Sequence, residues 1–151
     1  MSAEGFNALL SEFGRKIGLP ELRADESGYC ALSFDDLDAH LQYEGEQDEV
    51  VVLTRLGTID LDDPTETYAR LLGGNLFWEG TGGATLAVEP ETGMVFLQAK
   101  AAVRSLDGAG FESLLERFIV AAERWRKEIV PDAGAVGEAV PLPGTDSFVR
   151  G

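Results

Sequence analysis

Three short runs with strand character follow one another in residues 29–56, YCALSFDDLDAHLQYEGEQDEVVVLTRL. Residues 29–34 lie between turn residues, residues 39–44 alternate apolar and polar side chains, and residues 49–56 are rich in β-branched valine. Such alternation is typical of a strand with one buried face. Because only a short polar connection separates the second run from the third, we expect a hairpin and an antiparallel meander.

Amphipathic periodicity predicts the first and the last helix of the chain. The apolar side chains of residues 6–17 recur at i, i+3, i+4, i+7 and i+11, which places them on one helical face, and Gly18 should end that helix. The closing helix has Asp107 near its start and Pro131 beyond its end. Its apolar stripe consists of Phe111, Leu114, Leu115, Phe118, Ile119, Ala122, Trp125 and Ile129.

A shorter helix and a second hairpin are expected between the three predicted strands and the closing helix. Asp63 is a candidate helix cap, Pro64 suits the first helical position, and the glycine pair at 73–74 should end the helix. Residues 84–89 and 94–99 then predict two strands joined by a turn.

The predicted order of elements is therefore α-β-β-β-α-β-β-α. Strands joined by hairpins, with helices before, between and after them, indicate an α+β domain with a twisted antiparallel sheet packed against helices. We expect a single domain over residues 1–130. Residues 131–151 are rich in glycine and proline and poor in apolar anchors, so we expect a disordered C-terminal tail.

The composition and net charge of the chain argue against some classes of binding partner. The 151 residues are 44% hydrophobic and carry a formal charge of −15, which argues against binding to nucleic acid or to an anionic membrane. Such acidity favours solubility, and it would also attract a basic partner. The only cysteine is Cys30, and no apolar run is long enough for a membrane span. Since the N-terminal residues also lack a signal-peptide pattern, we expect a cytoplasmic protein.

The sequence offers little that suggests catalysis. His40 is expected on the polar face of a strand, and Cys30 reads as a small buried side chain. A Cys30–His40 nucleophile pair stays open as an alternative if neighbouring strands bring the two together. The aspartates at 60–63 lack the spacing of a calcium loop, and the glycines at 80–83 lack the lysine of a phosphate loop. We therefore expect no enzyme, no metal site and no cofactor.

Three segments together resemble a known family. They are LLGGNL at 71–76, GGATLAV at 82–88 and ETGMVFL at 91–97, and they precede the apolar stripe of the closing helix. In this order they resemble the type III secretion chaperones of the Tir chaperone (CesT) family, class I. The resemblance covers roughly residues 3–130 and leaves the tail without a counterpart. Asn75, after the second helix, is expected to be structural and to tolerate a left-handed conformation.

The resemblance implies an ATP-independent homodimer that binds the N-terminal segment of a secreted effector, a virulence protein, and keeps it soluble and competent for secretion. An extended segment could pair with a sheet edge and place alternate side chains into apolar pockets. A chaperone-fold regulatory or sensory domain without a role in secretion is the alternative.

The resemblance also implies which residues make the contacts, although each of them could instead fill the monomer core. The dimer contacts would be Tyr68, Leu71, Leu72, Phe77, Trp78, Leu86 and Val88. The effector contacts would be Leu9, Phe13, Leu32, Phe34, Leu41, Tyr43, Val51 and Leu53.

Overall fold

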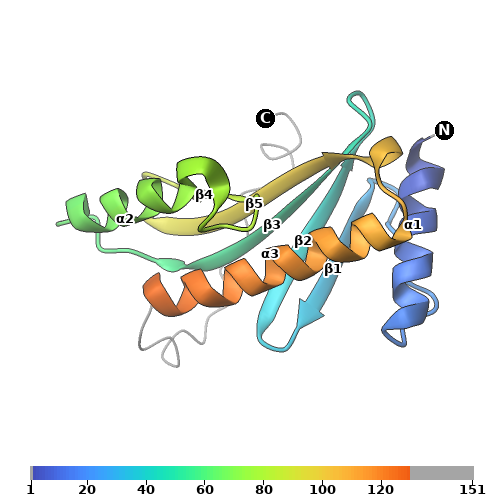
Figure 1. Ribbon diagram of the computed structural model, residues 1–151, viewed down its shortest axis with the longest axis horizontal. Coiled ribbons are helices and arrows are strands. Elements are labelled where there is room, and N and C mark those ends of the chain that lie inside the picture. The colour runs from blue at the N-terminus through green and yellow to red at the C-terminus, as the bar shows by residue number, and fades with distance from the viewer. Residues whose placement is uncertain (1, 130–151) are drawn as a thin grey trace.

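The computed structural model describes residues 2–129, and Figure 1 shows their arrangement. The expected order of helices and strands is confirmed, with two short 3₁₀ turns added. Pro131 and the predicted disordered tail lie outside the described residues. The elements are α1 (Ser2–Lys16), β1 (Tyr29–Phe34), β2 (Leu37–Glu44), β3 (Glu49–Thr58), α2 (Thr65–Asn75), η1 (Leu76–Trp78), β4 (Thr85–Val88), β5 (Met94–Ala102), η2 (Val103–Ser105) and α3 (Gly108–Ile129).

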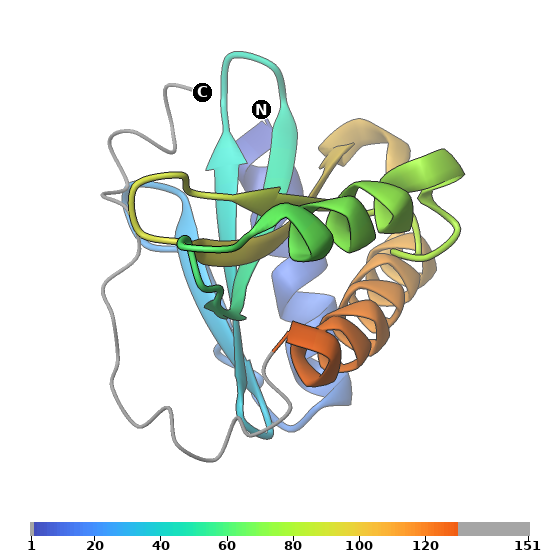
Figure 2. The ribbon, with the colours of Figure 1, turned by 90° about the vertical axis from the view of Figure 1, so that its left-hand side faces the viewer.

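The five strands form one antiparallel sheet in the order β1-β2-β3-β5-β4. The predicted meander is β1-β2-β3, and the second hairpin, β4-β5, joins it through the pairing of β5 with β3. This places β1 and β4 at the two edges. All three α-helices lie on one face of the strongly twisted sheet, as the two ribbon views show (Figures 1 and 2).

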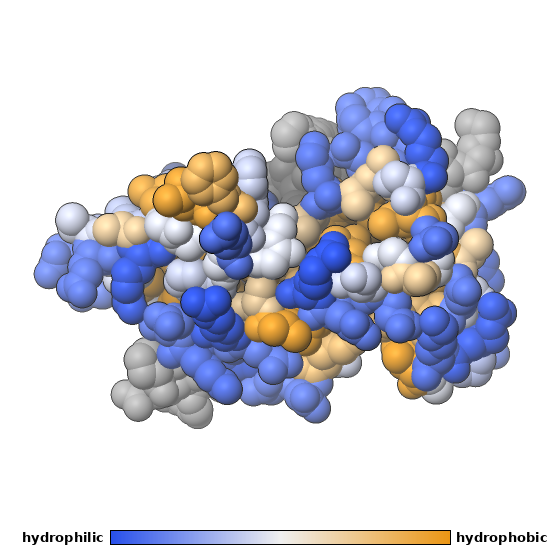
Figure 3. All heavy atoms as spheres, viewed as in Figure 1, coloured by the Kyte–Doolittle hydropathy of each residue, from blue (hydrophilic) through white to orange (hydrophobic). Residues whose placement is uncertain are grey.

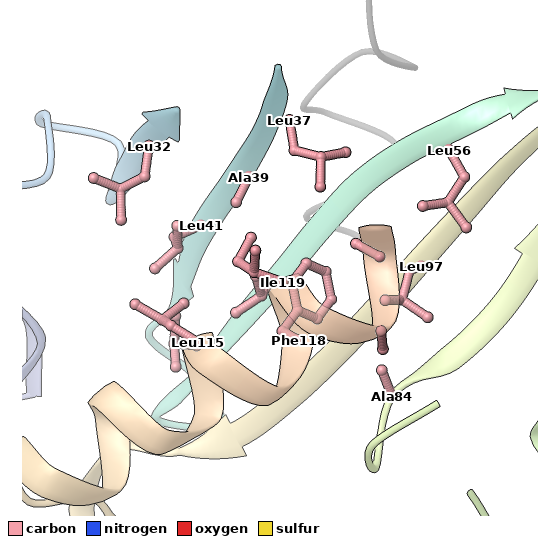
Figure 4. Close-up of a cluster of buried hydrophobic side chains, with 14 of the residues drawn as sticks. Leu32, Leu37, Ala39, Leu41, Leu56, Ala84, Leu97, Leu115, Phe118 and Ile119 are labelled. Atoms are coloured by element: carbon pink, nitrogen blue, oxygen red, sulfur yellow. The ribbon is translucent and has the colours of Figure 1, made fainter. Parts of the chain in front are cut away.

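The main core lies between α3 and this face of the sheet (Figure 4). Leu115 and Phe118 of α3 are almost fully buried, and they lie in one cluster with Leu41 of β2 and Leu97 of β5. Complete burial of each such side chain is worth about 1.5–3 kcal/mol. The apolar stripe of the closing helix therefore packs against the apolar face of the strands, and together they form one core.

The ends of the first and last helices follow local chemistry. The Asp107 carboxylate accepts a 2.7 Å hydrogen bond from the backbone N–H of Gly110, so this aspartate caps the start of α3. In α1 the apolar face ends one turn earlier than the periodicity suggests. The helix stops at Lys16, Gly18 turns the chain with a φ of 82°, and Ile17 is left 43% exposed.

The ends of α2 differ from the sequence expectation. Its N-cap position is Pro64, without a side-chain cap, so Asp63 does not cap the helix. Gly73 and Gly74 lie inside α2 instead of ending it. The reason is tertiary packing: a Cβ atom on Gly74 would collide with the indole ring of Trp125, so only glycine lets α2 approach α3 this closely.

Candidate interaction surfaces

Four large apolar side chains stand out at the end of α2 and in η1. Leu72, Leu76, Phe77 and Trp78 are 70%, 68%, 77% and 56% exposed, and we call them the apolar segment. Figure 3 shows apolar side chains gathered on the surface over this part of the molecule. A contiguous exposed patch of such residues marks an interaction site more often than chance exposure of single side chains does.

The backbone of the apolar segment is strained. Phe77 and Trp78 both adopt the left-handed region, with φ of 55° and 57°. Bulky residues rarely do so, and each such residue costs on the order of 1–3 kcal/mol. Two successive left-handed residues hold the rings out from the domain, and strain of this kind concentrates at functional sites.

The loop behind these rings is firmly held. The Thr81 side chain is fully buried, and its hydroxyl hydrogen-bonds the carbonyl oxygens of Ala84 and Trp78. The indole N–H of Trp125 in α3 donates a 2.7 Å hydrogen bond to the Gly80 carbonyl. The hydrogen bonds of Thr81 and Trp125 therefore fix the loop that follows the apolar segment. Their free energy can offset the cost of the strained backbone at Phe77 and Trp78.

Asn75 has a structural role that differs from the expected one. Its φ is −77°, so it is not left-handed. Instead its side-chain amide accepts a 2.8 Å hydrogen bond from the Leu86 N–H and donates a 3.1 Å bond to the Leu86 carbonyl. The side chain thus occupies the position of a neighbouring strand at the β4 edge, which blocks further pairing there.

The residues expected at a dimer contact divide into two groups. Leu71 and Leu86 are buried in the main core, and Tyr68 and Val88 pack against it half-buried. Only Leu72, Phe77 and Trp78 are openly exposed. The same surface also includes Leu76, which the sequence interpretation omitted although it directly precedes Phe77.

The residues expected to contact an effector also divide. Leu9 and Phe13 come from α1, four others come from the side of the sheet that faces the helices, and Val51 and Leu53 project from the opposite face. Those on the helix side already fill the monomer core or pack against it, so contact with an effector through them stays a prediction. The six are Leu9, Phe13, Leu32, Phe34, Leu41 and Tyr43.

The alternative Cys30–His40 pair is not assembled. In the β1–β2 register Cys30 lies opposite Leu41 and His40 lies opposite Ala31, so the two side chains project from opposite faces of the sheet. Burial raises the pKa of the Cys30 thiol, which disfavours a nucleophilic thiolate. His40 is half-buried and shares a 2.6 Å hydrogen bond with the Tyr29 hydroxyl, so it is not the freely exposed histidine that the sequence suggests.

Within residues 2–129 no cluster of three or more histidine, cysteine or acidic side chains is placed to hold a metal ion. No helix of that part of the chain is long and apolar enough to cross a membrane.

An open groove of about 380 Å³ lies between the loop at 79–82 and α3, where Val120 is 68% exposed between Arg117 and Arg124. The surface features that stand out in residues 2–129 are the apolar segment and this groove.

The sequence pattern of the Tir chaperone protein (CesT) family matches residues 8–126, which run from α1 to the last turns of α3. The chain belongs to the Tir chaperone (CesT) family. The resemblance noted in the sequence is thereby confirmed, and so is the α+β chaperone fold.

The chain is also similar to one known protein and to two solved complexes, at 26–29% identity. The chain is 29% identical over 139 residues to the transcriptional anti-antiactivator ExsC of Pseudomonas aeruginosa, covering 91% of this chain and 93% of ExsC. The crystal structure of the ExsC–ExsE complex matches with a TM-score of 0.70 at 26% identity, over 84% of this chain and 95% of that one. The ExoT–SpcS complex from Pseudomonas aeruginosa matches with a TM-score of 0.60 at 26% identity, over 80% and 96%.

Proposed function

We propose that this protein is a class I type III secretion chaperone. In this proposal a homodimer binds the N-terminal segment of an effector without ATP and keeps it soluble and competent for secretion. The observation that carries the proposal is the family match over residues 8–126. The complexes of ExsC with ExsE and of SpcS with ExoT support a protein partner for this chain as well.

The apolar segment is the proposed homodimer contact. Burying Leu72, Leu76, Phe77 and Trp78 against a second copy would remove large apolar side chains from water, at about 25 cal/mol for each Å² buried. The same patch of both copies would meet across a two-fold axis, as in most homodimers. The strained φ angles of Phe77 and Trp78 fit this role, because dimerisation would use the outward position of their rings.

The β1 edge is the proposed place for an extended effector segment. An added strand gains main-chain hydrogen bonds at a sheet edge and side-chain contacts at alternate positions. Asn75 already occupies the β4 edge by bonding both backbone groups of Leu86, whereas β1 forms the six-residue edge at the other side of the sheet. An effector would thus lie along β1, with Phe34 and Tyr43 half-buried beside it.

The formal charge of −15 supports the proposed role of keeping a complex in solution. Like-charged complexes repel one another, and a negative surface speeds the encounter with a basic segment. The attraction should weaken as salt is added, because exposed charges more than about 10 Å apart are screened at roughly 0.1 M ionic strength.

A regulatory role is the second candidate, and the match to ExsC favours it. ExsC is an anti-antiactivator of transcription, and its match extends over 91% of this chain. In that case the partner would be a regulator instead of, or in addition to, a secreted protein.

Deletion of the gene in the native host separates the two candidates. A chaperone predicts that one or a few effectors disappear from the secreted fraction while their transcripts stay level, and that the wild-type gene restores secretion. A purely regulatory domain predicts a change in the transcripts of many secretion genes together. Unchanged secretion and unchanged transcription would refute both.

A further inference from the structure

Strand β5 extends beyond its neighbour β4 at one end. β4 pairs with β5 only from Val95 to Gln98, whereas β5 continues to Ala102 and stays paired with β3 on its other side. Figure 1 shows β5 running on past β4 toward η2. Among residues 2–129 no strand pairs with residues 99–101 on the β4 side, and we call these three residues the open edge.

Two glycines explain why β4 begins so late. Gly82 and Gly83 have φ of 62° and 94°, in the left-handed region that glycine adopts readily. They turn the chain directly before β4 begins at Thr85, so the preceding residues do not continue the pairing to the open edge. The buried Thr81 hydroxyl holds this turn through its hydrogen bonds to two carbonyl oxygens. The gap in the sheet is therefore built into the fold.

A pocket of about 230 Å³ lies beside the open edge, between β5 and α3. Ala99 and Ala101 line it from β5, and their register opposite two fully buried valines of β3 places both on the face toward the helices. Leu114 and Phe118 line it from α3. The small alanine side chains leave room for an apolar side chain from outside the domain.

The charged residues that line this pocket are both cations, Lys100 and Arg117, although the whole chain carries a formal charge of −15. Arg117 makes no ion pair within residues 2–129, and its guanidinium donates a 3.1 Å hydrogen bond to the Ser113 hydroxyl. Lys100 lies 3.3 Å from the Glu49 carboxylate, but its side chain is 67% exposed. Since charges beyond about 8 Å are largely screened at roughly 0.15 M ionic strength, these two cations dominate the field at the pocket.

We propose that the open edge and its pocket bind an extended, acidic segment of a partner protein. The segment adds to β5 in line with β4 and pairs with the backbone groups that alternate residues of the open edge direct away from β3. One of its apolar side chains enters the pocket, and the acidic side chains beside it meet Lys100 and Arg117. A second copy of this chain fits less well, because each copy would bring the same two cations to the contact.

This surface goes beyond the proposed function. The open edge and the β1 edge lie at opposite sides of the sheet, so one partner segment cannot pair with both. The two surfaces also differ in the charge that they favour. Binding at the open edge does not require a role in secretion, and a peptide tests it with the purified protein.

The probe is the peptide EDVTVDE, whose two valines point to one side of an extended chain and whose ends are acidic. It is titrated into the ¹⁵N-labelled full-length protein at about 0.15 M salt, and amide NMR locates the contact. We expect the largest shifts at residues 99–101 and at Gly82 and Gly83. The peptide KKVTVKK has the same centre and basic ends, and it should bind at least tenfold more weakly.

Charge reversal at the pocket tests the assigned cations. K100E/R117E should weaken binding of EDVTVDE at least tenfold. The matched control is R15E/K127E, which changes the net charge by the same amount at two exposed cations outside the pocket lining and should bind as the wild type does. Circular dichroism checks that both variants keep the fold.

Four results would overturn the proposal. They are shifts confined to β1 or to other surfaces, equal binding of the acidic and the basic peptide, equal losses in the two double variants, and no binding of EDVTVDE at millimolar concentration. Amide shifts at residues 99–101 on dilution of the protein alone would also count against it, because they would mean that a second copy occupies the open edge.

Discussion

At the β4 edge, the Asn75 side chain makes the hydrogen bonds that a neighbouring strand would otherwise make. Its two hydrogen bonds satisfy the N–H and the carbonyl of Leu86, which would otherwise lie unpaired at the end of the sheet. The sequence indicated a structural asparagine here, but for the wrong reason. Helix-end statistics favour a left-handed asparagine, whereas the pairing with a residue 11 positions away depends on tertiary structure that local patterns do not contain.

Replacing Asn75 should therefore destabilise the fold. We expect N75L to lower the free energy of unfolding by about 1–3 kcal/mol, because two backbone groups lose their partners. N75D keeps the acceptor for the Leu86 N–H and loses the donor, so it should fall in between. Urea unfolding followed by circular dichroism measures the difference. Equal stability of N75L and the wild type would contradict the assigned role.

His40 should make stability depend on pH. Burial lowers the pKa of His40 below its ordinary 6.5, against an opposing effect of Asp38. The unfolded state then binds the proton more readily than the folded state, so stability should fall as pH drops through about 6.5 and below.

The variant H40Q isolates this effect, because glutamine does not titrate. Between about pH 7.5 and 5.5 the wild type should lose more stability than H40Q, as measured by urea midpoints. Parallel pH profiles for the two proteins would rule the His40 effect out. The effect of the many carboxylates is common to both proteins and cancels in the comparison.

Among the elements, α2 departs most from its sequence expectation. Two adjacent glycines normally end a helix, because glycine is a poor helix former. Here the helix continues through both, since close packing against Trp125 requires the absence of a side chain at Gly74. The strands were easier to predict, because alternation of apolar and polar residues reports directly on a sheet with one covered face.

The two glycines of α2 offer a matched pair of variants. G74A should destabilise the fold by about 1–3 kcal/mol, because its Cβ atom would collide with the Trp125 ring. G73A meets nothing within 4 Å, and it should be neutral or stabilise by about 0.5–1 kcal/mol through helix propensity. Thermal and urea unfolding of both variants tests this order. The reverse order would contradict the packing assigned to α2.

For the whole molecule, the sequence indicated the fold and the family more fully than it indicated the surfaces. Leu71 and Leu72 were both expected at a dimer contact, yet one is buried in the core and the other is 70% exposed. Neighbouring helical residues point about 100° apart, and the pattern alone does not say which apolar face the rest of the chain covers. The exposure of Leu76 and the strain at Phe77 likewise emerge only in three dimensions.

A dimer built on the apolar segment makes a direct prediction. L72D should weaken the dimer at least tenfold, because it would bury an unpaired charge at the contact. The matched control is L19D, which adds the same charge at an exposed leucine distant in sequence from that segment. Light scattering across a dilution series measures the mass. A wild-type monomer at micromolar concentration, or an L72D dimer as tight as the wild type, would contradict the proposed contact.

In the proposed function, the protein holds an extended N-terminal segment of a secreted effector. The most direct measurement is purification of the complex from the native host, followed by hydrogen–deuterium exchange of both partners. We expect slowed exchange in one stretch near the effector's N-terminus and along β1 of this chain, with the rest of the effector unaffected. Protection confined to a folded domain of the partner, or the absence of any secreted protein among the partners, would contradict it.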